Sequence, residues 1–343
     1  MIQRYPAGKG KVLSVNVLLH LKKRKIVQNF LTFPLSSPYG QPMTPSTAVA
    51  AFTAETHADR EIASQPEVWR KVAAVAPSLA GLLPAHGERV AAVGCGSSWF
   101  MSMAYAGVRE SAGHGETDIY AGSEFNYDRK YDRIVAISRS GTTTETVELL
   151  AKTKIPSVVI TGVAGSPVTE HATESIILDF ADEESVVQTR WATAVLGLLR
   201  AHNGTDLLPL ADQCELALAA DLGELPNVEQ FSFLGRGWTI GLANEAALKT
   251  REAAQFWAEA YPAMDYRHGP MSIAQKGRCT WAFGAIDKKL EEEIIATGAL
   301  YESSTWDPMV HLVKAQRVAI ALAKKRGLNP DYPRGLNRSV ILN

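Results

Sequence analysis

The chain has 343 residues, with 35 lysines and arginines against 36 aspartates and glutamates, and its formal net charge is −1. This length suffices for two domains of ordinary size. The balanced charge gives no global reason to expect nucleic acid or a membrane surface as a partner, although a local basic patch stays open. Three widely spaced cysteines without CxxC spacing indicate a reducing, cytoplasmic compartment and no structural metal.

Residues 1–42 differ in composition from the rest, because they carry seven lysines and arginines but no aspartate or glutamate. The apolar piece 12–21 is too short to span a bilayer and lacks a signal-peptide cleavage site. We interpret this segment as a disordered basic arm, or as an extension from a misplaced start codon upstream of Met43. An organelle presequence fits less well.

The first half of the chain shows the alternation of a doubly wound parallel sheet. A helical leader is expected over 43–75 and a first domain over 76–205. In this domain the apolar runs 90–93, 134–137, 157–160 and 176–178 alternate with helical stretches 98–112, 143–152 and 190–201.

The second half looks like a second copy of this unit. When Val93-Gly-Cys-Gly is placed over Leu234-Gly-Arg-Gly, both glycines of one segment fall on glycines of the other. Residues 203–226 are expected to form a linker that contains a short helix, and as a domain division the linker is set at 206–226. A second domain is expected over 227–326 and a tail over 327–343. The expected elements of the second copy are strands at 231–234 and 279–285 and helices at 241–256 and 309–326.

A loop of hydroxyl side chains follows the second apolar run. Ser138, Ser140, Thr142 and Thr143 can donate to oxygen atoms, and Gly141 lets the backbone approach a ligand closely. The following helix points its free N–H groups at the same place. These features predict a phosphate site, while an ordinary turn that caps the helix explains a single such loop equally well.

A second loop of this kind, Gly94-Cys-Gly-Ser-Ser98, follows the run 90–93. Such loops open at the carboxyl ends of parallel strands, so both can reach one ligand at the switch point. A dinucleotide-binding pattern is the alternative for Gly94 and Gly96. It requires a third glycine where this chain has Trp99, and NAD is therefore disfavoured.

The helix expected over 241–256 places Glu245, Lys249 and Glu252 on one face. A solvated ladder of ion pairs is the usual explanation of this spacing. His268 then precedes a Gly-Pro turn, where a lone histidine is usually structural. Together, a carboxylate base and an imidazole supply what opening and isomerising a cyclic sugar requires.

These motifs, in collinear order, resemble tandem sugar isomerase (SIS) domain proteins. The resemblance covers roughly residues 55–343, and it is carried by both hydroxyl loops, Phe233–Gly237, Glu245–Glu252, Ala258–Tyr261, His268–Pro270 and Pro333–Val340. The chain is similar to the isomerase half of glucosamine-fructose-6-phosphate aminotransferase and to free-standing phosphosugar isomerases, deaminases and deglycases. The resemblance implies two flavodoxin-like α/β sheets flanked by helices, no cofactor and no metal.

The resemblance also implies residue roles. Glu252 matches a glutamate that moves a proton between C1 and C2, and His268 matches a histidine that assists ring opening from the partner subunit of a homodimer. The tail, with Asn337 and Arg338, is expected to fold over the sugar as a lid. Phosphate capture is assigned to Ser97, Ser98, Ser138, Ser140 and Thr143.

Four departures limit these implications. Arg338 stands where the aminotransferase has a Schiff-base lysine, and a guanidinium cannot form that imine at neutral pH. Arg139 replaces a glutamine and is expected to strengthen binding of phosphate or of a second anionic group. Gln188 replaces a small hydroxyl residue in the substrate-lining segment 183–190. The glutaminase half is absent from this chain.

The sequence therefore predicts an enzyme that interconverts aldose and ketose forms of a sugar or amino-sugar 6-phosphate, with or without release of ammonia or an amine. The alternative is a non-catalytic sugar-phosphate sensor. Against this alternative, the chain has no evident helix-turn-helix segment, and a sensor does not require both Glu252 and His268.

Overall fold

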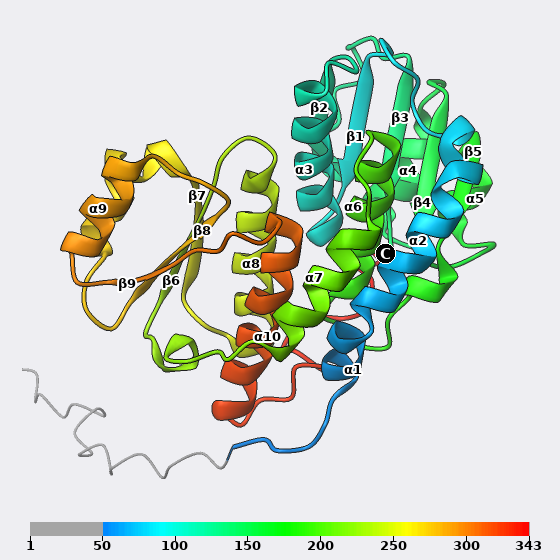
Figure 1. Ribbon diagram of the computed structural model, residues 1–343. Helices are drawn as coiled ribbons and strands as arrows, with labels where there is room; N and C mark the ends of the chain where they lie inside the picture. Colours follow the sequence, from blue (N-terminus) through cyan, green and yellow to red (C-terminus); the bar gives the residue numbers. More distant parts are fainter. Residues whose placement is uncertain (1–50, 343) are drawn as a thin grey trace, which may run out of the picture. The chain divides into compact units, whose positions relative to one another are not determined.

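The computed structural model describes residues 51–342 (Figure 1), and these residues all belong to one unit of the chain. The expectations for residues 1–42 lie outside the described part. Within residues 51–342 no helix is long and apolar enough to cross a membrane.

The first sheet consists of five parallel strands in the order β2-β1-β3-β4-β5. This is the flavodoxin-like order, with its switch point at β1 and β3. The strands are β1 (Val90–Gly94), β2 (Thr117–Ala121), β3 (Arg133–Ile137), β4 (Ser157–Thr161) and β5 (Glu174–Ile177).

Both faces of this sheet are covered. Val90 and Ala92 of β1 pack into the cluster that also holds α2 and α6, whereas Ala91 and Val93 pack into a second cluster with α4 and α5. Alternate side chains of a strand point to opposite faces, so a strand buried on both sides reads as a continuous apolar run. The runs predicted at 90–93, 134–137 and 157–160 are confirmed as strands for this reason, and the run 176–178 overlaps the edge strand β5.

The second sheet has four parallel strands in the order β7-β6-β8-β9: β6 (Phe231–Gly235), β7 (Ala258–Pro262), β8 (Cys279–Phe283) and β9 (Leu300–Glu302). Its order repeats the first four positions of the first sheet. The distance along the chain from the start of β1 to the start of β6 equals the distance from the start of β2 to the start of β7. An α/β fold with two parallel sheets is thus observed, while a division into two tandem domains stays a prediction.

The helices connect and flank these strands (Figure 1). They are α1 (His57–Ala63), α2 (Gln65–Leu79), α3 (Ser97–Ser111), α4 (Thr144–Lys152), α5 (Pro167–His171), α6 (Arg190–His202), α7 (Leu208–Ala219), α8 (Thr239–Ala254), α9 (Lys288–Ala296) and α10 (Pro308–Lys325). Helix α1 and most of α2 lie in the region 43–75 where a helical leader is expected, α2 extends beyond it to Leu79, and α7 lies in the region 206–226 where a linker is expected.

Helices α3 and α8 approach each other so closely that glycine is needed in the contact. A Cβ on Gly241 of α8 would lie 2.5 Å from the Phe100 carbonyl oxygen of α3, and a Cβ on Gly107 would lie 2.7 Å from Trp238 Cα. The largest hydrophobic cluster accordingly includes residues of both sheets, such as Val90 and Phe231. The start of α3, with one hydroxyl loop, lies beside α8, since a Cβ on Gly96 would come 3.9 Å from the Leu248 side chain.

Candidate active site

The loop between β3 and α4 carries the hydroxyl side chains and the glycine on which the predicted phosphate site rests. Ser138 and Ser140 are buried, Thr143 is half-buried, and Gly141 has φ = +66°. The Ser140 hydroxyl accepts hydrogen bonds from the Thr142 amide at 3.2 Å and the Thr142 hydroxyl at 3.0 Å. The buried Ser138 hydroxyl has no hydrogen-bond partner among the described residues, which leaves it available to a ligand.

The second hydroxyl loop lies at the end of the adjacent strand. Ser97 and Ser98 are the first residues of α3, and both are buried. Because β1 and β3 are neighbours, their loops open at the same edge of the sheet. The structure thus brings Ser97 and Ser98 to the edge that carries Ser138.

On α8, Glu245 and Lys249 are 0% and 1% exposed, respectively, and only Glu252 reaches solvent. A solvated ladder of ion pairs is therefore the wrong explanation for this face. The Lys249 ammonium lies 3.6 Å from a Glu245 oxygen and donates a hydrogen bond to Glu252. Burial opposes its charge, but the two carboxylates raise the pKa of Lys249 and keep it an ammonium.

Glu245 is the most deeply buried of the three charged residues on this face of α8. Burial raises its pKa to about 7, while Lys249 and the Ser97 hydroxyl act in the opposite direction. Both of its carboxylate oxygens lack a conventional hydrogen-bond partner among residues 51–342. The start of α3 lies beside this part of α8, since a Cβ on Gly96 would come 3.9 Å from the Leu248 side chain, and the Ser97 hydroxyl is thereby close enough to lower the pKa of Glu245.

Glu252 faces a cavity of about 410 Å³, which is lined by Arg251, Glu252, Gln255, Phe256, Arg334 and Leu336. A second cavity, of about 820 Å³, is lined by Ser140, Thr142, Val163 and residues 335–341. Leu336 lines both cavities. The C-terminal tail therefore lies between Glu252 and the loop that follows β3.

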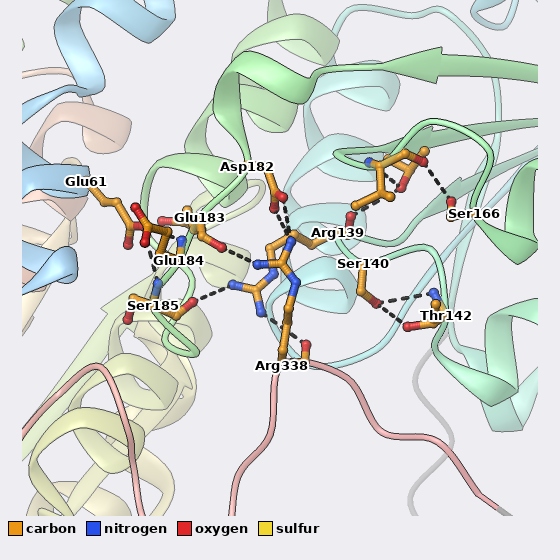
Figure 2. A network of polar contacts seen from close by, with 12 residues as sticks. Glu61, Arg139, Ser140, Thr142, Ser166, Asp182, Glu183, Glu184, Ser185 and Arg338 are labelled. Atoms are coloured by element: carbon orange, nitrogen blue, oxygen red, sulfur yellow. Dashed lines mark hydrogen bonds and ion pairs between the residues drawn. The ribbon is translucent and has the colours of Figure 1, made fainter.

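The segment 182–189 borders this region and meets the tail (Figure 2). Gln188 is half-buried, and its side-chain oxygen has no partner among the described residues. Glu183 Oε1 accepts hydrogen bonds from the Thr189 amide and hydroxyl, both at 2.7 Å, and from the Arg190 amide at 2.8 Å. These contacts hold Glu183 in place, while its second oxygen remains unpaired among the residues described.

Arg139 makes contacts that differ from the expectation of direct anion binding, and these contacts reach the tail. The Nη atoms of Arg139 donate to the carbonyl oxygens of Ser185 at 2.8 Å and Arg338 at 3.0 Å. Arg338 turns its guanidinium towards Asp182. Asn337 is exposed and lines the 820 Å³ cavity.

His268 is not brought to Glu252 within this chain. It is exposed at the end of a short helix, Ala263–His268, and does not line the cavity of Glu252. Among residues 51–342 it makes no hydrogen bond or ion pair. Its expected action from a partner subunit stays a prediction.

Glu61 of α1 was not expected near the site. Its carboxylate accepts hydrogen bonds from the amides of Glu184 at 2.6 Å and Ser185 at 3.3 Å. Burial, with Glu183 second, raises the pKa of Glu61 to about 7. No local pattern marks this residue, because its partners lie more than 120 positions away along the chain. Among the described side chains, no group of three potential metal ligands converges.

Comparison with known proteins finds relatives that are named for reactions of sugar phosphates. No protein-family model matches it. It is 28% identical over 295 residues to glutamine–fructose-6-phosphate aminotransferase (isomerizing) of Sulfolobus acidocaldarius, an alignment that covers 74% of this chain and 50% of that protein. The chain spans about half the length of the curated relatives it matches.

Two solved structures show the same fold. Glucosamine-6-phosphate deaminase from Thermotoga maritima superposes with a TM-score of 0.72 and 24% identity, covering 84% of this chain and 100% of that one. The C-terminal domain of glucosamine-fructose-6-phosphate aminotransferase from Francisella tularensis superposes with a TM-score of 0.69 and 22% identity, covering 82% of this chain and 99% of that one. The chain is therefore homologous to one part of these aminotransferases and shares the fold of their C-terminal domain.

Proposed function

We propose that the chain is an enzyme that interconverts the aldose and ketose forms of a sugar 6-phosphate or amino-sugar 6-phosphate. The observation that carries this proposal is the position of the tail between the hydroxyl loop at Ser140 and the cavity of Glu252. A phosphate held at one side and a carboxylate at the other match the two ends of an open-chain sugar phosphate. The similarity to the aminotransferases supports the same substrate class.

In this proposal, Ser97, Ser98, Ser138, Ser140 and Thr143 bind the phosphate group. Hydroxyl donors and the amino-terminal ends of α3 and α4 provide the partial positive charge that an anion requires. Glu252 then moves a proton between C1 and C2, and its ion pair with Lys249 orients the carboxylate. Gln188 contributes a free oxygen that can accept a hydrogen bond from a sugar hydroxyl.

Release of ammonia or an amine from the substrate is a second candidate. Glu61 and Glu245 each have a pKa raised to about 7. Carboxyl groups with such values supply protons at neutral pH, as a leaving amine requires. The aminotransferases and the deaminase that resemble this chain are named for reactions that involve nitrogen.

The duplication of the chain is part of the proposal. The matching strand orders and the equal spacing of β1 from β6 and of β2 from β7 support two copies of one unit. The first copy is proposed to bind phosphate, and the second to provide Glu252.

The test is a substrate panel with ammonia detection. Purified protein is incubated with fructose 6-phosphate, glucosamine 6-phosphate, tagatose 6-phosphate and fructosyl-amino-acid phosphates, and ketose, aldose and free ammonia are measured. We expect turnover of at least one compound and its loss, by a factor of about 100 or more, in Glu252→Gln.

Glu67→Gln is the matched control, because Glu67 forms an exposed ion pair with Lys71 on α2. It is expected to leave turnover unchanged. Circular dichroism of Glu252→Gln establishes that the variant is folded. Full activity in a folded Glu252→Gln variant would exclude Glu252 as the proton shuttle, and tight binding without turnover would favour the sensor.

A further inference from the structure

Two arginines connect three separate parts of the chain (Figure 2). Arg139 belongs to the loop after β3, is 3% exposed, and donates hydrogen bonds to Ser185 and to the carbonyl oxygen of Arg338. Both Nη atoms have a carbonyl acceptor, which compensates in part for the burial of the charge. Arg139 therefore ties the loop after β3 to the segment 182–189 and to the tail.

Arg338 completes the connection from the tail side. Its Nη1 donates to the Glu183 carbonyl oxygen, and its Nη2 contacts both carboxylate oxygens of Asp182, one of them at 2.6 Å. A guanidinium stays protonated and presents a planar fork, so it suits this combination of carbonyl and carboxylate acceptors. The side chain and the carbonyl of Arg338 are thus both engaged.

The residues after Arg338 continue along the loop that follows β3 and the start of α4. The Ser339 and Thr142 hydroxyls form a hydrogen bond at 2.9 Å, in which Ser339 can donate because Thr142 donates to Ser140, and the Thr144 amide donates to the Val340 carbonyl at 3.3 Å. The Leu342 amide donates to the Thr144 hydroxyl at 2.9 Å. The tail therefore covers the hydroxyl loop.

Burial of apolar side chains does not explain this placement. Leu336, Val340, Ile341 and Leu342 are between 41% and 64% exposed. Because hydrophobic stabilisation scales with the area removed from water, these residues hold the tail only weakly. Polar contacts therefore hold residues 336–342, through the two arginines and through the hydrogen bonds of Ser339, Val340 and Leu342.

We propose that Arg139, Arg338 and Asp182 form a clasp that positions the tail over the phosphate loop and so encloses the substrate. The expected effect of the clasp on turnover rests on the proposed function. Its expected effect on the position of the tail does not depend on any reaction. All three are positioning residues. In this proposal Arg338 positions the tail and does not contact the carbon atom of the sugar with which the aminotransferase lysine forms an imine.

The first test measures hydrogen–deuterium exchange of the backbone amides of residues 336–342 in the full chain without substrate. Arg338→Gln and Asp182→Asn each remove the ion pair, and we expect exchange in this segment to rise about fivefold. The double variant is expected to match the more affected single variant, because both changes remove one interaction. Arg338→Lys retains one charged contact and should give an intermediate rate.

Arg70→Gln is the control, since Arg70 forms an exposed ion pair with Asp212 between α2 and α7. It should leave exchange of the tail unchanged. Equal exchange in the wild type, Arg338→Gln and Asp182→Asn would overturn the clasp.

The second test separates the clasp from the proposed function. With a substrate found in the panel, Arg338→Gln and Asp182→Asn should raise KM about fivefold and leave kcat within about twofold, because neither residue touches the reacting atoms. A large loss of kcat at unchanged KM would contradict the positioning role. If the wild type turns over no sugar phosphate while the variants still accelerate exchange of the tail, the clasp stands and the proposed reaction fails.

Discussion

At the scale of single residues, burial decides which of the charged side chains can take part in chemistry. Glu245, Lys249 and Glu252 have a spacing that is common on solvated helices, yet two of them are almost fully buried. The carboxylates keep Lys249 charged, whereas burial favours the neutral form of Glu245. The neighbours of each buried side chain therefore decide whether it keeps its charge.

The raised pKa of Glu245 predicts a dependence of stability on pH. Its pKa is about 7 in the folded chain against a reference value of 4.5. The folded state thus holds the proton more tightly, so this contribution to stability is complete below pH 4.5 and is lost as pH rises through 7.

Glu245→Gln stays neutral and should not show this loss. The free energy of unfolding of the variant minus that of the wild type should therefore rise by about 1–3 kcal/mol from pH 5 to pH 8. Urea denaturation at several pH values measures both free energies. Glu67→Gln is the control. Lys71 lowers the pKa of Glu67, so this carboxyl group changes its protonation below pH 5 and its removal should not alter the pH dependence between pH 5 and pH 8. A parallel pH dependence in Glu245→Gln and the wild type would contradict the raised pKa.

At the scale of elements, the contact between α3 and α8 positions the site. It brings Ser97, at the start of α3, to the face of α8 that carries Glu245. Gly241 permits this contact, because a Cβ there would lie 2.5 Å from a backbone oxygen and 2.7 Å from a backbone nitrogen of α3. Backbone atoms cannot turn aside as a flexible side chain can.

Gly241→Ala is therefore expected to destabilise the fold. Alanine gains about 1 kcal/mol over glycine in helix propensity, but the overlap with α3 should exceed this gain and give a net loss of about 1–3 kcal/mol in the free energy of unfolding. Urea denaturation measures the change. Gly81→Ala is the control, because a Cβ at Gly81 would meet nothing within 4 Å. An equally stable Gly241→Ala variant would show that the helices can separate without cost.

The elements also show which local patterns were informative. The strands β1, β3 and β4 are buried on both faces and appear as short apolar runs. The edge strands β2, β7 and β9 were not predicted, because their side chains are mostly half-buried or exposed and form no such run. Helix α8 begins at Thr239, two residues before the predicted start.

At the scale of the whole molecule, the exposed His268 is separated from the cavity of Glu252 within one chain. If the histidine acts on the site of a second subunit, inactive variants should complement each other. Mixing Glu252→Gln with His268→Ala should give dimers in which one site has both wild-type residues. About a quarter of the activity is expected, because half of the dimers are mixed and each has one complete site.

Steady-state turnover after mixing measures this recovery. Subunit exchange is verified independently, by native mass spectrometry of size-tagged chains. No recovery despite exchange would count against donation of His268 by a partner, and full activity of His268→Ala alone would remove the histidine from the mechanism.

The sequence by itself determined the α/β class, the strands of the sheet centres and the hydroxyl loops at Ser97 and Ser138. These follow from local chemistry, since an apolar run needs a buried environment and a hydroxyl-rich turn after a strand suits an anion. Only the tertiary structure decided that Lys249 is buried, that Glu61 approaches Glu183 and that Arg139 holds the tail. Each of these depends on contacts between residues far apart in the chain, which no local pattern encodes.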